Sequence, residues 1–411
     1  MKSKLIRTLQ ERGFINQVTN LPGLDDAAEK GPVTSYIGFD LTADSLHVGS
    51  LIQIMVLRWM ARLGHNPIVL LGEATTRIGD PSGKTHARPM LTDAEIERNR
   101  IGIVHVIDRL VGVVKPHTRH ISNAEWFSND GPSYMDFLSH YGRHFSINQM
   151  LTFDSVKTRL ARQDPLSFLE FNYMLMQAID FLKLYERCDC TLQIGGSDQW
   201  GNIVNGVELT RRIAKQEVFG LTTPLMTNSA GEKMGKTANG AIWLDADKTS
   251  AFEFFQFWRN VEDRKAGEFL RLFTELPIDD ITALEIGDIN AAKRVLAREV
   301  TALVHGRATA EHAAMLAEGK VETVKSEMIP VHVISAALAM AGVTLAQILF
   351  DSKLVGSKTE AAKIASNGGV KVNGATVYDV RETLHRSAFD NDNFVLSLGK
   401  KKMILVRLED G

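Results

Sequence analysis

The chain has 411 residues, of which 44% are hydrophobic and 23% are charged, and its net charge is −2 at pH 7. This composition is ordinary for a globular protein with a buried core, and the length predicts two to three domains. Because the chain is nearly neutral, its bulk charge does not indicate a polyanion partner, and any nucleic-acid contact must depend on local patches.

The two cysteines, Cys188 and Cys190, are separated by one residue, a spacing that matches neither a zinc knuckle nor a C-x-x-C redox pair. The N-terminal stretch "MKSKLIRTLQERG" is of mixed charge and lacks the apolar core of a secretory signal. No apolar run is long enough to cross a membrane. We therefore expect a cytoplasmic protein in a reducing compartment, without a membrane partner.

The first third of the chain predicts a strand, a helix and a second strand. Residues 33–39, "VTSYIGF", have the composition of a buried strand, and "NPIVLLGEAT" follows as another. Between them, apolar residues recur with helical spacing from about Leu46 to Leu63. This order is typical of a βαβ unit, so we expect an α/β fold with a parallel sheet.

The junction between the first strand and the helix carries "HVGS", residues 47–50. A helix N-terminus attracts anions, and Asp44 or Ser45 can cap it. His47 can donate hydrogen bonds to phosphate oxygens, and Gly49 lets a flat group approach the backbone. Alternatively, Gly49 only permits helix–sheet packing and His47 is a capping residue. The four residues alone do not decide between these hypotheses.

The segment after the second strand is polar and does not form a P-loop. "IGDPSGKTHAR", residues 78–88, has one residue too few between its glycines, so Lys84 is not a P-loop lysine. Asp80, Lys84 and Arg88 still follow a strand, where open α/β sheets bind ligands. An ordinary solvated loop is the alternative.

Residues 92–150 are less regular. Thr92 and Glu95 form a capping-box pattern, which predicts a helix to about Val114. Residues 120–150 are mixed and aromatic, and we expect an insertion there.

Two later segments combine helix or strand patterns with polar residues. Tyr173, Gln177 and Asp180 share one face of a predicted helix, "NYMLMQAIDFLKLYE". They can line a pocket or form a solvent-exposed stripe, and spacing favours neither. "CTLQIGG" predicts a strand that runs into the Gly-rich turn of "QIGGSDQWGNI", where Asp198 and Gln199 can bond a ribose or an amine. A plain turn is the alternative.

Beyond residue 225 the pattern changes. "GEKMGKT", residues 231–237, places Lys233 and Lys236 three residues apart in a loop that can bind phosphates. A charged surface turn is the alternative. Residues 247–320 are mostly helical, and "SEMIPVHVIS" around Pro330 is a predicted linker. The tail, residues 343–411, predicts a small α+β unit with strands around "GGVKVNGATV" and "KKMILVRL".

Together these segments resemble the bacterial type of tyrosyl-tRNA synthetase. The resemblance covers almost the whole chain and is carried, in order, by "YIGFDLTADSLHVGSL", "IGDPSGK", "SVKTRL", "YMLMQAID", "QIGGSDQWGNI" and "KMGKT". Two departures matter. Ser50 stands where the family's His-Ile-Gly-His signature has its second histidine, and Gly235 and Thr237 replace serines of the Lys-Met-Ser-Lys-Ser signature. Leu41 also stands where proline is common.

The resemblance implies a domain organisation and a reaction. It implies a Rossmann-like catalytic domain over residues 1–225, with residues of about 90–150 at the interface of a homodimer. Residues 226–328 would hold the mobile lysine loop and a helical tRNA-binding domain, and residues 343–411 a small RNA-binding domain. The enzyme would join L-tyrosine to ATP, with Mg²⁺, as tyrosyl-adenylate, and would then charge tRNA(Tyr). No metal site made by the protein is implied.

The resemblance also implies residue roles. His47 would contact the phosphates and Gly49 would lie beneath the adenine, with Ser50 beside them. Lys233 and Lys236, with Lys84 and Arg88, would face the departing pyrophosphate. Tyr36 and Asp180 would bond the phenol hydroxyl of tyrosine, and Tyr173, Gln177 and Asp80 its ammonium group. The rest of the pocket would be lined by Gly38, Asp40, Gln193, Gly195, Asp198 and Gln199.

The tail resembles a small RNA-binding domain shared with a ribosomal protein, through "LVGSKTEAAKIASNGGVKVNG". Its local positive charge comes from Lys353, Lys358, Lys363, Lys371 and the run Lys400–Lys402. Salt-sensitive phosphate contacts would follow, and a solvated charged face is the alternative. Three other functions remain open at this point: a tryptophanyl-tRNA synthetase, an RNA-binding protein on an inactive synthetase scaffold, and a small-molecule nucleotidyltransferase.

Overall fold

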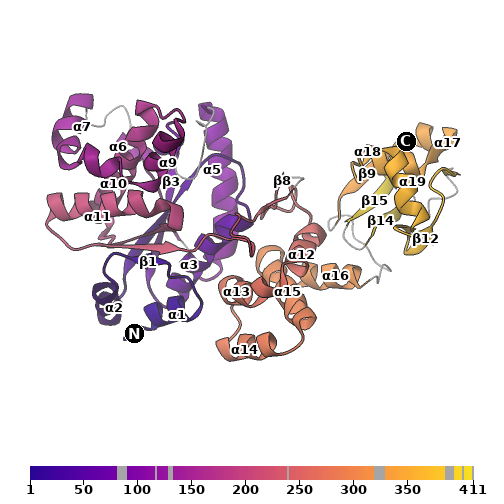
Figure 1. Cartoon of the computed structure of the whole chain (residues 1–411), viewed down its shortest axis with the longest axis horizontal. Helices are drawn as coiled ribbons and strands as arrows, with labels where there is room; N and C mark the ends of the chain where they lie inside the picture. Colours follow the sequence, from indigo (N-terminus) through magenta and orange to yellow (C-terminus); the bar gives the residue numbers. More distant parts are fainter. Residues whose placement is uncertain are drawn as a thin grey trace. The chain divides into compact units, whose positions relative to one another are not determined.

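Figure 1 shows a computed structural model of the chain, which describes residues 1–80, 90–115, 118–127, 133–237, 240–318, 329–384, 393–399 and 402–409, with the backbone alone at 154–155 and 236–237. The chain forms two compact units. Unit 1 comprises Met1–Leu244 and Gly267–Ala283, and unit 2 comprises Asp245–Ala266 and Leu284–Gly411. None of the described helices is both long and apolar enough to cross a membrane.

Unit 1 is built on a six-stranded sheet with the order β1-β6-β5-β2-β3-β4. The strands are β1 (Gln17–Val18), β2 (Thr34–Asp40), β3 (Asn66–Gly72), β4 (Arg119–Ser122), β5 (Leu192–Gly196) and β6 (Phe219–Thr223). Strand β1 is antiparallel to β6, and the other pairs are parallel. The predicted parallel sheet and its strands at 33–39, in "NPIVLLGEAT" and in "CTLQIGG" are confirmed.

The strand order places a crevice beside β2. The chain leaves β2 through α3 (Leu51–Arg62) to its neighbour β3, whereas the neighbour on the other side, β5, comes much later in the sequence. Connections that leave neighbouring strands in opposite directions open a crevice at the carboxyl ends of those strands. Ligands of open α/β sheets bind there.

Alternate side chains of the central strands enter different cores. Tyr36, Ile68 and Leu70 pack with Ala178, Ile179 and Phe181 of α10 (Phe168–Cys188). Because successive strand residues point to opposite faces, Ile37 and Val69 face the other way, and α3 packs against β3 and β5. Helix α11 (Trp200–Ala214) packs along α10 in Figure 1. A side chain on β2 therefore reaches either α10 or α3.

The remaining elements of unit 1 are short helices and turns. They are α1 (Lys4–Glu11), α2 (Leu21–Lys30), α4 (Glu73–Thr76), α5 (Asp93–Ile107), α6 (Ala124–Phe127), α7 (Tyr134–His140), α8 (Ile147–Met150), α9 (Asp154–Arg162), the 3₁₀ turns η1 (Val48–Ser50), η3 (Gly142–His144) and η4 (Ser197–Gln199), the π-helical turn η2 (Asp108–Gly112), and the strands β7 (Lys236–Thr237) and β8 (Gly240–Ala241). The predicted capping box at the start of α5 is present, with Thr92 and Glu95 bonding each other's backbone N–H groups.

Three details differ from the sequence-based expectations. The helix predicted from Leu46 begins at Leu51, because η1 precedes it and the side chain of His47, not of Asp44 or Ser45, caps that turn. Residues 120–150 are not wholly an insertion, since β4 pairs with β3 in the main sheet. The predicted linker at Pro330 is wrong for Val331–Ile334, which form β9 and pair with β15 (Lys402–Leu408).

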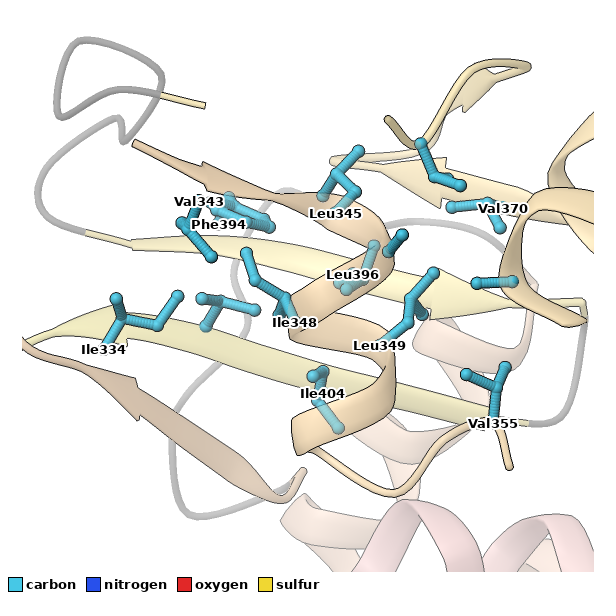
Figure 2. Close-up of a cluster of buried hydrophobic side chains, with 14 of the residues drawn as sticks. Ile334, Val343, Leu345, Ile348, Leu349, Val355, Val370, Phe394, Leu396 and Ile404 are labelled. Carbon is cyan, nitrogen blue, oxygen red and sulfur yellow. The ribbon is translucent and has the colours of Figure 1, made fainter. Parts of the chain in front are cut away.

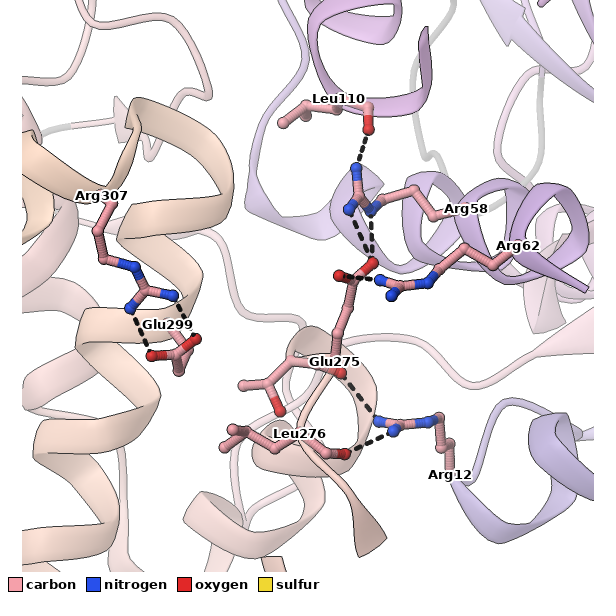
Figure 3. A network of polar contacts seen from close by, with 9 residues as sticks. Arg12, Arg58, Arg62, Leu110, Glu275, Leu276, Glu299 and Arg307 are labelled. Atoms are coloured by element: carbon pink, nitrogen blue, oxygen red, sulfur yellow. Dashed lines mark hydrogen bonds and ion pairs between the residues drawn. The ribbon is translucent and has the colours of Figure 1, made fainter. Parts of the chain in front are cut away.

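Residues Gly267–Ala283, here called the return segment, are covalently flanked by unit 2 but pack in unit 1. Figure 3 shows how three arginines hold them. Arg12 donates to the carbonyl oxygens of Arg271, Thr274 and Leu276, at 3.2, 2.9 and 2.6 Å. Its guanidinium also stacks 4.1 Å from the ring centre of Trp59 on α3.

Glu275 is the acidic centre of this contact. Arg58 Nη2 lies 2.7 Å from Glu275 Oε1, Arg62 forms an ion pair with the same carboxylate, and Arg58 also donates to Leu110 O. Burial alone would raise the pKa of Glu275, but the hydrogen bond from Arg62 and the charge of Arg58 lower it. These contacts explain why Gly267–Ala283 pack in unit 1 although their chain neighbours on both sides belong to unit 2.

Unit 2 has a helical part and a sheet part. The helices are α12 (Ala251–Arg259), α13 (Asp263–Phe273), α14 (Ile278–Ile286), α15 (Ile289–His305) and α16 (Arg307–Ala317), of which α13 and α14 continue into the return segment. Helices α12, α15 and α16 pack against one another. The expectation of a mostly helical stretch over residues 247–320 is confirmed for the described residues.

The sheet part begins at β9 and has its own core, which Figure 2 shows. The order of its main sheet is β12-β11-β14-β15-β9. The elements are β9, α17 (Ala336–Ala341), β10 (Val343–Thr344), α18 (Leu345–Asp351), α19 (Lys358–Ser366), β11 (Val370–Val372), β12 (Ala375–Val377), β13 (Thr383–Leu384), β14 (Asn393–Leu398) and β15. Leu345, Ile348 and Leu349 of α18 pack on Phe394, Leu396 and Ile404.

We predict that Glu275→Gln destabilises unit 1 by about 2–3 kcal/mol, because it leaves the buried guanidinium of Arg58 without its counter-charge. Urea unfolding of the full chain, followed by circular dichroism, measures this change. The matched control is Glu97→Gln, which removes an exposed i,i+3 ion pair with Arg100 on α5 and should leave the midpoint unchanged. Equal midpoints for the two variants would contradict the central role of Glu275.

Candidate active site

A cavity of about 980 Å³ lies at the carboxyl ends of β2 and β5. Its walls come from β2, η1, the start of α3, one face of α10, the Gly-rich turn after β5, and the lysine loop before β7. It brings together most of the predicted site residues: Tyr36, Gly38, Asp40, His47, Gly49, Ser50, Asp80, Tyr173, Gln177, Asp180, Gln193, Gly195, Asp198, Gln199 and Lys233. Lys84, Arg88 and the side chain of Lys236 lie outside the described residues.

The deepest acidic group of the cavity is Asp180, on α10. Its side chain accepts hydrogen bonds from Trp126 Nε1 at 2.8 Å and from Asn123 Nδ2 at 3.2 Å. Burial raises the pKa of Asp180 to about 7, the two hydrogen bonds oppose this, and the nearby charge of Asp40 adds to it. The carboxyl group is therefore held in place and titrates near neutral pH.

Two polar atoms on residues of β2 and β5 that line the cavity are buried without a hydrogen-bond partner among the described residues. They are Tyr36 Oη and Gln193 Oε1, on residues that pair across β2 and β5. Burial, together with the charge of Asp180, raises the pKa of Tyr36 well above its usual value, so its hydroxyl stays protonated. An unpaired buried donor or acceptor is unfavourable, and a polar ligand group would satisfy it.

Asp40, at the end of β2, connects this end of the cavity to its middle. Tyr173 Oη and Thr75 Oγ1 each donate to Asp40 Oδ1 at 3.2 Å, and Asn123 Nδ2 donates to Thr75 Oγ1 at 3.1 Å. Burial, followed by the charge of Asp40, raises the pKa of Tyr173 well above its usual value. Tyr173 and Asp180 are buried, and with Gln177 they line the cavity. The face of α10 left undecided by spacing is therefore a pocket wall.

A second network orders the amides at the middle of the cavity. Gln199 Nε2 donates to Asp80 Oδ2 at 2.7 Å, and Asn202 Nδ2 donates to Gln199 Oε1 at 3.1 Å and to Gln177 Oε1 at 3.0 Å. Each amide therefore presents a defined oxygen or nitrogen to the cavity. The Gly-rich turn is part of the pocket and not a plain surface turn.

The imidazole of His47 folds back over its own turn. Gly49 N donates to His47 Nδ1 at 3.0 Å, and a Cβ at position 49 would come within 2.7 Å of His47 Cε1. The ring of His47 thus occupies the space that a side chain at position 49 would fill. Since Nδ1 accepts this bond, Nε2 is the nitrogen that can donate to a ligand.

The lysine loop docks on the same turn. Val48 N donates to Ile242 O at 2.9 Å, and His47 pairs with Trp243 in an isolated bridge. Gly235 has a φ of +102°, and a Cβ there would lie 3.1 Å from Val48 Cγ2. Lys233 Nζ bonds Asp198 Oδ2 at 2.9 Å across the cavity mouth. The two segments that resemble the family signatures, residues 47–50 and 233–237, are therefore in direct contact.

The sequence analysis did not identify four residues that hold the site together: Thr75, Asn123, Trp126 and Asn202. Asn202 lies three residues after Gln199 at the start of a helix, so the spacing could have indicated it. Asn123 and Trp126 follow β4, inside the segment interpreted as an insertion, and no local pattern marks them.

The cavity therefore offers acceptor groups at its deep end, ordered amides in its middle, and a histidine, a helix start and a lysine at its mouth. Such a site can bind a ligand with several hydrogen-bonding groups. It lacks an activated nucleophile among the described residues, so its chemistry would depend on positioning two substrates and stabilising charge.

Comparisons with known proteins identify the family of the chain. Residues 28–319 match the model of the class I tRNA synthetases for tryptophan and tyrosine, and residues 326–406 match the C-terminal domain model of tyrosine–tRNA ligases. The tyrosine–tRNA ligase of Rhodospirillum rubrum is 49% identical over 100% of this chain and 99% of its own length. That of Caulobacter vibrioides is 49% identical over 99% of this chain and 98% of its own.

Among solved structures, a C-terminally truncated mitochondrial tyrosyl-tRNA synthetase from Aspergillus nidulans is similar, with a TM-score of 0.69 and 32% identity over 77% of this chain and 94% of that one. The tyrosine specificity of the full-length relatives favours tyrosine over the tryptophan and inactive-scaffold alternatives. The chain therefore belongs to the tyrosine–tRNA ligases, class I aminoacyl-tRNA synthetases that use ATP to activate tyrosine and transfer it to tRNA.

Proposed function

We propose that the deep end of the cavity binds the phenol group of tyrosine between Tyr36 and Asp180. The observation that carries this assignment is the buried, unpartnered Tyr36 Oη beside a buried carboxylate. A phenol hydroxyl can accept from Tyr36 while it donates to Asp180, which satisfies both groups. Phenylalanine would leave both unpaired, and tyrosine would thereby be selected.

The middle of the cavity would hold the ammonium group of tyrosine. Tyr173 Oη, Gln177 Oε1 and the Asp80 carboxylate supply acceptors there. Bonds through Gln199 and Asn202 orient Gln177 and Asp80, and the bond to Asp40 orients Tyr173. Asp40, Gln193 and Gln199 would complete the polar wall, and Gly38 and Gly195 would leave room for the substrate.

The mouth of the cavity would bind ATP. His47 Nε2 would donate to a phosphate oxygen, with Gly49 and Ser50 under the nucleotide, and Asp198 would bond the ribose. Lys233 would leave Asp198 for the phosphates, joined by Lys236, Lys84 and Arg88. The tyrosine carboxylate attacks the α-phosphorus, pyrophosphate departs, and the ribose hydroxyl at the tRNA end then displaces AMP from the tyrosyl group. Because the nucleophile is already ionised, positioning and charge stabilisation dominate.

Mg²⁺ would enter bound to ATP. Among the described residues, no group of three or more His, Cys, Asp or Glu side chains is arranged to hold a metal ion. Phosphate oxygens and water are ligands that Mg²⁺ commonly retains.

We predict that Asp180→Asn lowers kcat/KM for tyrosine in ATP–pyrophosphate exchange by roughly a hundredfold, since the phenol loses a charged acceptor. In the unsubstituted enzyme, the pKa of Asp180 near 7 makes the carboxylate predominate above that pH. The KM for tyrosine should therefore rise as the pH falls below 7, by up to about tenfold per pH unit. This rise can be measured by ATP–pyrophosphate exchange between about pH 6 and about pH 8.

The control for this experiment is Tyr36→Phe, which removes the phenol partner but leaves Asp180 ionisable. It should keep the pH profile and mainly erode the preference for tyrosine over phenylalanine. A flat profile in the unsubstituted enzyme, with full exchange in Asp180→Asn, would refute the pocket assignment.

We also propose a homodimer whose interface lies on helices α7 to α10. These helices share a buried cluster around Met150, Val156, Met174 and Leu175. Their outer faces nevertheless expose large apolar side chains: Tyr134, Met135, Ile147, Leu151, Leu160, Phe168 and Leu169. Exposed apolar surface of this extent is typical of an interaction site.

We expect Phe168→Asp, at a side chain that is 69% exposed, to dissociate the dimer because it places a charge in the apolar contact. Analytical ultracentrifugation of the full chain measures the oligomeric state. Ile286→Asp, at a position 83% exposed on α14, is the matched control and should sediment as the parent protein does. A monomeric parent protein would contradict the proposal.

The sheet part of unit 2 would bind tRNA(Tyr). Its support is a set of exposed lysines on α19, on β11 and near them: Lys353, Lys358, Lys363, Lys371 and Lys402. Lys400 and Lys401, the rest of the predicted run, lie outside the described residues. Lysine–phosphate contacts release counterions and give salt-dependent affinity.

Replacing Lys358 and Lys363 together by Gln should raise the KM for tRNA. A plot of the logarithm of tRNA affinity against the logarithm of salt concentration should become less steep, by about 1.5 in slope. Tyrosine-dependent pyrophosphate exchange should not change. Lys4→Gln with Lys30→Gln, at two exposed lysines of unit 1, is the control for the loss of two charges. Equal losses of exchange and charging in the tail variant would count against an RNA-binding role.

A further inference from the structure

The turn between β2 and His47, residues 41–46, has no regular secondary structure. Four of its residues form part of the cavity wall: Thr42, Ala43, Ser45 and Leu46. A segment without a helix or a sheet ladder must find partners for its backbone N–H and C=O groups elsewhere. The elements that supply those partners therefore control where the turn lies.

Side chains from two other elements bond both backbone groups of Leu41. Leu41 N donates to Thr76 Oγ1 of α4 at 2.7 Å, and Asn99 Nδ2 of α5 donates to Leu41 O at 2.8 Å. Leu41, Thr76 and Asn99 are all buried, so water does not compete for these bonds. The N–H belongs to the peptide group that joins Asp40 to Leu41, and the carbonyl belongs to the next peptide group. Together the two bonds fix the course of the chain on both sides of Leu41.

Helix α5 also contacts the turn through its backbone. Asn99, Gly102 and Ile103 share one face of α5, at spacings of three and four residues. A Cβ on Gly102 would overlap the carbonyl oxygen of Asp44, so the absence of a side chain lets the helix meet the turn directly. Ile103 is buried and lines the cavity. One face of α5 thus holds the turn at two points and forms part of the cavity wall beside it.

The bonds to Leu41 supply a constraint that leucine itself lacks. Leu41 stands where proline is common in the family, and proline fixes its own φ angle and has no backbone N–H. A leucine has no such restriction, and its N–H needs a partner when it is buried. The hydroxyl of Thr76 is that partner. Because proline could not form this bond, Thr76 matters to the turn only when the residue at position 41 carries an N–H.

We propose that Thr76 and Asn99 are positioning residues that hold the turn of residues 41–46, and with it His47, in the geometry that binds ATP. This role rests on the proposed assignment of the cavity to tyrosine and ATP. Tyr36 and Asp180, at the phenol end, come from β2 and α10 and not from the turn. The two positioning residues therefore act on the nucleotide and leave the binding of tyrosine unchanged.

The test measures tyrosine-dependent ATP–pyrophosphate exchange by the full chain, at varied ATP and saturating tyrosine. Thr76→Val leaves a buried N–H unpaired, and Asn99→Ala leaves a buried carbonyl unpaired. Each should lower kcat/KM for ATP about tenfold. The affinity for tyrosine without ATP, measured by calorimetry, should stay at the parent value.

Two further variants serve as controls. Thr76→Ser keeps the hydroxyl and should retain the parent kcat/KM for ATP. Thr282→Val removes an exposed hydroxyl that donates to Ile278 O on α14, and it should change neither kcat/KM nor the affinity for tyrosine.

Leu41→Pro separates the hydrogen bond from the packing of the Thr76 side chain. It removes the N–H that Thr76 binds, so the addition of Thr76→Val should then cost almost nothing. The same change should cost about tenfold with leucine at position 41. Equal losses in the two backgrounds would overturn the proposal.

Other results would also overturn it without the Leu41→Pro protein. One is an equal loss of kcat/KM for ATP in Thr76→Ser and Thr76→Val. Another is a loss of tyrosine affinity as large as the loss for ATP, which would show a general disruption of unit 1. An unchanged kcat/KM in both Thr76→Val and Asn99→Ala is a third. A parent enzyme without tyrosine-dependent exchange would refute the proposed function itself, and this role with it.

Discussion

Two neighbouring carboxylates, the half-buried Asp40 at the end of β2 and the buried Asp180 in the middle of α10, set the main physical constraint on unit 1. Buried like charges raise each other's energy unless donors surround them. Trp126, Asn123, Thr75 and Tyr173 are those donors, and they come from three separate parts of the chain, since Asn123 and Trp126 both follow β4. The pairing of β4 with β3 places two of these donors, because Asn123 directly follows β4 and Trp126 lies on the helix after it.

The constraint explains which parts of the site the sequence could predict. Tyr36, Asp180 and the glycines before Asp198 stand in long local patterns, so periodicity and resemblance placed them on the right strand, helix and turn. Asn123 and Trp126 act through contacts made far along the chain, and the strand that brings them is only four residues long. Short edge strands carry little periodic signal. The sequence likewise placed the helix start too early, since η1 continues the helical spacing of α3.

The two signature segments depend on each other through backbone contacts as well as through any shared ligand. Gly235 adopts a left-handed conformation that brings the lysine loop against Val48, and Gly49 leaves room for the ring of His47. A serine at position 235, common in the family, would be strained in this position. The glycine therefore suits a loop that rests on the His47 turn while Lys233 is paired with Asp198.

The return segment has a consequence for the order in which the chain folds during synthesis. The ribosome releases residues 1–244 before Glu275 exists, so Arg12 first emerges without the carbonyl oxygens that it binds in the return segment, and Arg58 without its counter-charge. Unit 1 can close only after α13 has been made, when part of unit 2 is already outside the exit tunnel. Chaperones would therefore meet a nearly finished sheet on which Trp59 and its neighbouring arginines are uncovered, and a fragment ending at Leu244 would leave them uncovered.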